Sequence, residues 1–149
     1  MSQLHTTNSG SSDTTTQSVT MFIFVNSDLD LPKGKMAAQV GHIVQLITEE
    51  IIRNGFEASG VPESYVDYIK WKQGGAIGTK IIKRASTAEL QELLKLEYAR
   101  GVTDECFAKA PAFSATIQKE QQQKQKYLTV VGLFPSSKYN DIAEKFSLY

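Results

Sequence analysis

The sequence has one cysteine, no excess of charge of either sign and no long hydrophobic run. Cys106 is the only cysteine among 149 residues, so it cannot form an internal disulfide, which is typical of proteins in reducing compartments. The 16 basic and 16 acidic residues give a formal net charge of zero. This balance argues against non-specific binding of nucleic acid, which depends on neutralising many phosphates, but it is compatible with a local basic site.

No apolar run approaches the roughly 20 residues that a membrane-spanning helix needs. The N-terminus has neither the apolar core of a secretion signal nor the arginines of a transit peptide. We therefore expect a cytoplasmic protein that does not contact a membrane. With 41% hydrophobic and 21% charged residues, the chain has the composition of one globular domain.

The first 18 residues differ in composition from the rest. They are nearly all Ser, Thr, Gln, Asn and Gly, and they lack the apolar side chains that could offset the entropy lost on ordering. We expect a disordered tail over residues 1–18 and a folded domain over residues 19–149.

Hydrophobic patterning in the folded part predicts alternating strands and helices. Strands are expected at residues 19–25, 77–82, 103–108 and 127–133, and helices at 33–53, 63–72, 87–100 and 136–146. Ser86 and Glu89 fit a capping box, while Asn54-Gly55 and Gly101 are expected to end two helices. The predicted fold is α/β: a single compact domain with a four-stranded mixed β-sheet and helices packed on both faces.

The segment at residues 31–42, between the first strand and the first helix, has the strongest functional signal. Lys33, Gly34 and Lys35 lie at the N-terminal end of the expected helix, here called the helix mouth. Free N–H groups and the helix dipole favour anions there, phosphate above all. The alternative is that the two lysines only solvate the start of a helix.

Helical spacing divides the next residues into three groups. An apolar stripe predicted to face the core consists of Met36, Val40, Ile43, Ile47 and Ile51. Lys35, Gln39 and His42 are expected to form one polar line along its edge. The remaining side has only small residues, Ala37, Ala38 and Gly41, as expected where another backbone packs closely, and is a candidate dimer interface.

These residues resemble the type 2 peptidyl-tRNA hydrolases, the archaeal and eukaryotic type. The matching residues are Asp28-Leu29, Lys33-Gly34-Lys35-Met36-Ala37-Ala38-Gln39, Gly41-His42, Trp71, Gly78-Thr79-Lys80, Glu89-Leu90, Gly101, Thr129-Val130-Val131-Gly132 with Pro135, and the closing Phe146 to Tyr149. The resemblance extends from about Thr20 to the last residue. Trp71 has two interpretations, packing in the core or stacking on a nucleobase, of which packing is the more frequent in proteins.

The resemblance implies hydrolysis of the ester between a peptide and the 3′ ribose of tRNA. It implies no metal and no cofactor, and a protein that is usually a homodimer. Lys33 and Lys35 would hold the tRNA backbone or the developing oxyanion. Gln39 and His42 would line the same pocket, and Thr129 corresponds to a family threonine.

One segment departs from the family pattern. Where the family has Asp-Ala-Gly-x-Thr with a catalytic aspartate, this chain reads Ala110-Pro-Ala-Phe-Ser114. The aspartate is thereby replaced by Ala110 and the threonine by Ser114. Asp104 and Glu105 are expected at the other end of the strand. Loss of such a carboxylate typically costs about 10²- to 10⁴-fold in rate.

Three hypotheses follow. The first is an active peptidyl-tRNA hydrolase, with Lys33, Lys35, Gln39, His42, Thr129 and Ser114 as candidate catalytic residues. The second is a catalytically impaired relative that binds tRNA or a protein partner through the lysine-bearing helix mouth. The third is a small dimeric α/β protein whose lysine segment serves no nucleic acid.

Overall fold

The computed structural model describes residues 18–74, 77–109 and 124–149. Its elements are β1 (Met21–Asn26), β2 (Leu29–Asp30), α2 (Lys33–Glu57), α3 (Glu63–Gln73), β3 (Lys80–Ala85), α4 (Thr87–Leu93), β4 (Ala99–Ala108), β5 (Gln125–Leu133) and α6 (Asn140–Ala143). Most of the predicted tail, residues 1–17, lies outside the described residues, as does the segment 110–123.

The strands form one mixed sheet in the order β2-β4-β5-β1-β3. All six residues of β1 are buried, as its continuous apolar sequence predicts. β1 pairs in parallel with β3 on one side and antiparallel with β5 on the other. β4 pairs antiparallel with both β5 and β2. The sheet has five strands rather than the predicted four, because β2 contains only two residues and has no hydrophobic pattern of its own.

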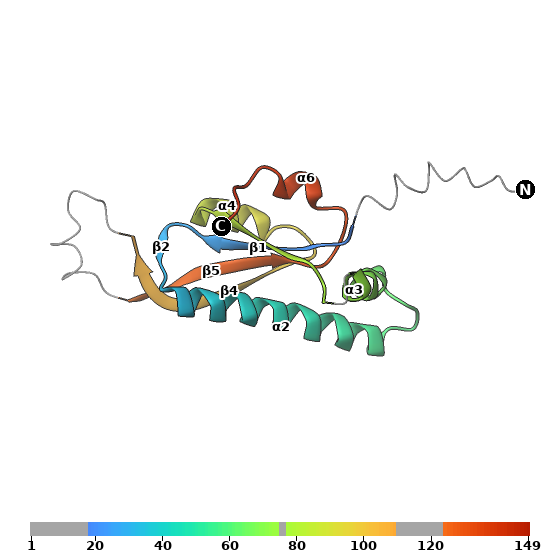
Figure 1. Ribbon diagram of the computed structural model, residues 1–149. Helices are drawn as coiled ribbons and strands as arrows, with labels where there is room; N and C mark the ends of the chain where they lie inside the picture. Colours follow the sequence, from blue (N-terminus) through green and yellow to red (C-terminus); the bar gives the residue numbers. More distant parts are fainter. Residues whose placement is uncertain (1–17, 75–76, 110–123) are drawn as a thin grey trace, which may run out of the picture.

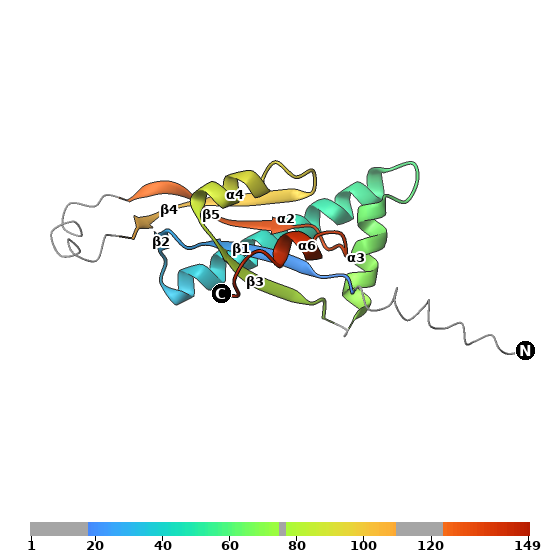
Figure 2. The same ribbon diagram turned by 90° about the horizontal axis from the view of Figure 1, so that it is seen from above.

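Helices cover both faces of the sheet, which confirms the predicted fold class (Figure 1). α2 and α3 lie on one face, and α4 and α6 on the other (Figure 2). Ile43, Ile47 and Ile51 of α2 are fully buried against the first face. Gly132 of β5 lies directly beneath them, where a Cβ atom would come within 2.8 Å of the Ile43 and Ile47 side chains. Glycine at this position therefore allows α2 to pack closely on the sheet.

Four predicted helix boundaries are wrong. α2 continues past Asn54-Gly55 to Glu57, and the last helix covers only Asn140–Ala143. α4 ends at Leu93 rather than at residue 100, because Ala99 pairs with Leu133 and begins β4. Gly101 accordingly lies in a strand instead of ending a helix. The capping box of Ser86 and Glu89 is confirmed, since each residue bonds the backbone of the other.

Trp71 packs in the core, which confirms the packing interpretation. Its side chain is only 4% exposed, and Nε1 donates a hydrogen bond of 2.7 Å to the Thr79 carbonyl. The ring lies against Gly78, whose φ of 85° favours glycine and where a Cβ would come within 2.7 Å of the indole. The indole is therefore committed to the turn before β3.

The C-terminal residues cover part of the outer edge of β3. The Tyr149 N–H donates to the Ile82 carbonyl and the Arg84 N–H donates to the Ser147 carbonyl, each at 2.9 Å. Pairing of this kind keeps a strand edge from binding another chain.

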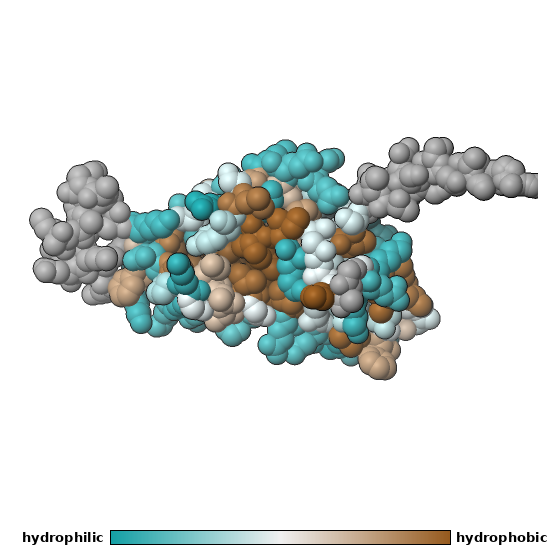
Figure 3. Space-filling model, viewed as in Figure 1, coloured by the Kyte–Doolittle hydropathy of each residue, from teal (hydrophilic) through white to brown (hydrophobic). Residues whose placement is uncertain are grey.

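Figure 3 shows apolar side chains gathered in the middle of one face of the molecule, with polar surface around them. No helix in the described parts of the chain is long and apolar enough to cross a bilayer.

Candidate active site

Four side chains from three elements form one connected polar network, consisting of Thr129, Gln39, Asp104 and Lys35. Thr129 Oγ1 of β5 lies 2.7 Å from Gln39 Oε1 of α2. Gln39 Nε2 donates a hydrogen bond of 2.9 Å to Asp104 Oδ2 of β4. Lys35 Nζ lies 3.7 Å from the same carboxylate oxygen and donates to the Glu105 carbonyl. The structure thus brings together three of the predicted site residues and one that was not predicted.

A β-bulge directs Thr129 into this network. In the β4–β5 ladder, Val102 pairs with Val130 and Thr103 pairs with Leu128, so the register skips Thr129. The extra residue allows Thr129 and its neighbour Val130 both to face α2, since Val130 packs in the core beneath that helix. Bulges commonly re-aim a side chain next to a functional site.

The chemistry of these groups fixes the direction of the hydrogen bonds. The Thr129 hydroxyl has one proton and lies near two acceptors, Gln39 Oε1 and the Val102 carbonyl at 3.0 Å. Thr129 is therefore a donor, and the Gln39 amide must direct its oxygen to Thr129 and its nitrogen to Asp104. Each buried polar group in the network has a partner, as burial requires.

Exposure increases along the network. Thr129 is fully buried and Gln39 is 2% exposed, whereas the side chains of Lys35 and Asp104 are 30% and 43% exposed. Only Lys35 and Asp104 can therefore meet a macromolecule at the surface. Gln39 and Thr129 lie beneath them and support them.

Asp104 is ionised at neutral pH. Its pKa lies below the usual value, chiefly because its Oδ1 accepts a hydrogen bond of 2.7 Å from the Glu105 backbone N–H. The charge of Lys35 and the amide of Gln39 lower it further. The surface end of the network is thus an ion pair between a carboxylate and an ammonium group.

Lys33 lies two residues before Lys35 in α2, and His42 lies apart from the network. Lys33 is exposed at the first residue of α2, and that turn has no acidic residue. His42 is also exposed, and it borders a surface hollow with Gln45, Glu49 and Arg53. Because α2 is continuous, His42 keeps the expected helical spacing with Lys35 and Gln39, but its side chain is exposed whereas Gln39 is buried. Ser114 and Ala110 lie outside the described residues.

The small-residue side of α2 is open within the described chain. A Cβ atom added at Gly41 would meet no described atom within 4 Å, and Ala37 and Ala38 are exposed. The expected close packing of another backbone on this side is therefore not provided by residues 18–74, 77–109 and 124–149.

Asp104 is the residue that sequence reasoning missed. It was expected at the end of the strand away from Ala110 to Ser114, which is wrong because β4 begins at Ala99, so that Asp104 lies within the strand and opposite α2. Two sequence signals could have indicated it. Gln39 is spaced four residues from Ile43, which is four residues from Ile47, so all three lie on the same side of α2. Val102, Asp104 and Cys106 are spaced two residues apart, so Asp104 lies on the core-facing side of β4.

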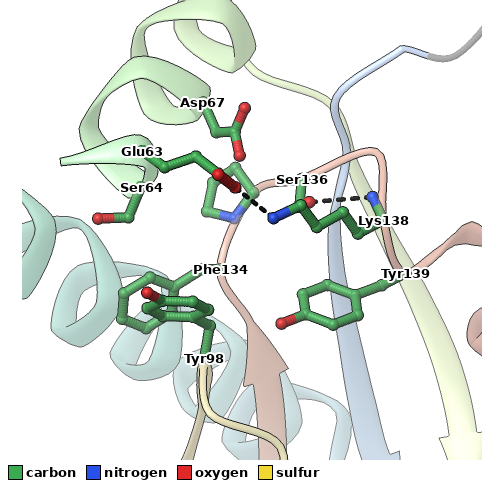
Figure 4. Close-up of a pocket in the computed structure, with 9 residues that line it drawn as sticks. Glu63, Ser64, Asp67, Tyr98, Phe134, Ser136, Lys138 and Tyr139 are labelled. Carbon is green, nitrogen blue, oxygen red and sulfur yellow. Dashed lines mark hydrogen bonds and ion pairs between the residues drawn. The ribbon is translucent and has the colours of Figure 1, made fainter.

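A second hollow lies at the opposite end of the sheet, between α3 and the segment after β5 (Figure 4). The Glu63 carboxylate forms an ion pair with Lys138 across it. Burial and the nearby Glu63 charge raise the pKa of Asp67.

In the described parts of the chain, no cluster of three or more His, Cys, Asp or Glu side chains could hold a metal ion, here or at the polar network.

Comparison with known proteins is consistent with this geometry. Residues 19–149 match the family model of the peptidyl-tRNA hydrolase PTH2. No sequence among the curated proteins matches the chain. The family match includes the whole sheet, α2 and all four residues of the polar network, which lie within the matched span. The chain therefore belongs to the peptidyl-tRNA hydrolase PTH2 family.

Proposed function

We propose that this protein hydrolyses the ester bond of peptidyl-tRNA and releases free tRNA and peptide. Family membership supports hydrolysis of this substrate class at the level of the family. The observation that carries the proposal to a site is the Lys35 ammonium, which is held at the mouth of α2 by Asp104 and the Glu105 carbonyl. A fixed, partly exposed cation of this kind suits both a polyanionic substrate and a developing oxyanion.

The reaction requires water to attack the ester carbonyl and the bond from the carbonyl carbon to the 3′ oxygen to break. The tetrahedral intermediate carries a negative charge on the former carbonyl oxygen, and we assign its stabilisation to Lys35. Preorganised charge stabilisation is usually the largest catalytic contribution. The proton of the attacking water leaves to bulk solvent or a basic group, and the 3′ oxygen gains a proton.

The other predicted residues have separate proposed roles. Lys33, exposed at the start of α2, would bind a phosphate of the tRNA and thereby set its register. Gln39 and Thr129 are too buried to touch the substrate and would support the surface residues. We further propose action in the cytoplasm as a homodimer that packs through Ala37, Ala38 and Gly41.

A direct assay tests the function. Purified protein is expected to release labelled peptide from peptidyl-tRNA over many turnovers. A matched substrate with an amide in place of the 3′ ester should not be cleaved, because hydrolysis of an amide is much more demanding. Absence of turnover even with enzyme in excess would contradict the proposal, and retained tRNA binding in that case would favour the impaired relative that only binds.

Lys33→Ala is expected to weaken tRNA binding in a salt-dependent manner. Loss of one phosphate contact should reduce the slope of log K against log salt by about 0.7 to 0.9, with little change in kcat. Titration of labelled tRNA at several salt concentrations measures this slope. Lys72→Ala is the matched control, because Lys72 is an exposed lysine of α3. An unchanged slope in Lys33→Ala would exclude the phosphate contact.

A further inference from the structure

We infer that Asp104 is a positioning residue of this site and that the buried Gln39 and Thr129 act on Lys35 only through it. This inference rests on the proposed hydrolysis and concerns how the site is held together. It assigns one linear order to the network, from Thr129 through Gln39 and Asp104 to Lys35.

The first step is that the two buried residues are hydrogen-bonded within the network and too buried to reach a substrate. Thr129 Oγ1 directs its single proton to Gln39 Oε1 at 2.7 Å, the shorter of its two contacts, with the Val102 carbonyl at 3.0 Å. The Gln39 amide oxygen accepts from Thr129, and its nitrogen donates to Asp104. Because both side chains are at most 2% exposed, any effect they have on the reaction must pass through the group that follows them.

The second step is that Asp104 is held at both carboxylate oxygens. Oδ1 accepts the Glu105 N–H at 2.7 Å, and Oδ2 accepts Gln39 Nε2 at 2.9 Å. A carboxylate fixed in this way cannot rotate without losing one of these bonds. Its orientation is therefore set by the backbone of β4 on one side and by α2 on the other.

The third step concerns the lysine. A lysine ammonium is a point charge on a flexible four-carbon stem, with three donors. Lys35 Nζ donates a hydrogen bond to the Glu105 carbonyl and forms an ion pair with the Asp104 carboxylate of the adjacent residue at 3.7 Å. Its remaining N–H donors are left for a ligand. Among the described residues, Asp104 is the only carboxylate in contact with Lys35, so it alone supplies a fixed countercharge.

A double-mutant cycle tests this order. Asp104→Asn and Thr129→Val are each expected to lower kcat by about tenfold to 10²-fold, within the range of lost electrostatic preorganisation. KM should fall in Asp104→Asn, because this variant removes a negative charge near the polyanionic substrate. It should stay unchanged in Thr129→Val, which leaves that charge in place. The double variant should be no slower than Asp104→Asn alone, since residues that act as a unit are not additive.

The controls separate positioning from folding and from charge. Glu57→Gln removes an exposed carboxylate at the other end of α2 and should retain the wild-type kcat. Asp104→Glu keeps the charge and should recover part of the activity lost in Asp104→Asn. Thermal unfolding identifies any variant that has lost its fold. Multiplicative losses in the double variant, or an Asp104→Asn variant as fast as wild type, would overturn the inference.

A second measurement does not depend on activity. Lysines are reductively ¹³C-methylated, and the Lys35 resonance is assigned by its absence in Lys35→Arg. Asp104→Asn and Thr129→Val should both shift this resonance, and Glu57→Gln should leave it in place. If Thr129→Val leaves it unmoved, the order is wrong whatever the assay shows. If both variants shift it but the wild type hydrolyses nothing, the order stands and the proposed function fails.

Discussion

Lys35→Ala is expected to reduce peptide release to a small fraction of the wild-type rate while the protein stays folded. The substitution removes the ammonium group at the surface end of the network, and removing one such charge-stabilising group typically costs about 10²- to 10³-fold in kcat. Lys35 is partly exposed, so its loss should change the free energy of unfolding little. Single-turnover hydrolysis with enzyme in excess measures the chemical step, and thermal unfolding checks the fold.

Lys33→Ala is the matched comparison for this result. Both lysines belong to the first turn of α2, but only Lys35 is a member of the polar network. Lys33→Ala should therefore raise KM with little change in kcat, whereas Lys35→Ala should lower kcat itself. A Lys35→Ala protein that retains kcat within a few-fold would show that Lys35 serves binding and not the transition state.

Trp71→Ala is expected to produce the largest loss of stability. Removing a buried tryptophan typically costs about 3–5 kcal/mol, a large part of the roughly 5–15 kcal/mol that stabilises a domain. Here the loss includes the hydrogen bond from Nε1 to the Thr79 carbonyl and the contact with Gly78. Denaturant unfolding measures the change in free energy, and Lys72→Ala, at the exposed neighbouring residue, should change it by less than about 0.5 kcal/mol.

The same variant distinguishes packing from nucleobase stacking in solution. If Trp71 only packs, Trp71→Phe should recover part of the stability and should bind tRNA as the wild type does. A Trp71→Ala protein of normal stability with weakened tRNA binding would instead indicate that the indole stacks on a base.

Local pattern was sufficient to predict several elements. The apolar run at β1, the start of α2, the bounds of α3 and the cap of α4 all follow from neighbouring residues, and each is observed near its predicted place. The end of α4 could not be predicted in this way. Leu94 and Leu96 continue a helical spacing, but they pack on the core from a turn, because pairing of Ala99 with distant Leu133 begins a strand.

The residues of the site likewise differ in whether local sequence could predict their positions. Lys35 and Gln39 could be grouped from helical spacing alone, since both lie on α2. Thr129 was indicated only by resemblance, and Asp104 was placed wrongly. Their positions depend on the register between β4 and β5, which is a long-range property. Ala110 to Ser114 lie outside the described residues, and Asp104 places a carboxylate at the site from an earlier point of the chain.

The bulge at Thr129 has a consequence for how the gene of such a protein can change. Leu128 and Val130 face opposite sides of the sheet on either side of it. Deletion of the single codon for Thr129 would leave those two residues adjacent, and strict alternation would keep each on its present face. Thr129 is thus one extra residue of β5 relative to the paired segment of β4. A one-codon deletion could therefore remove the innermost group of the network without reversing any other side chain of the strand.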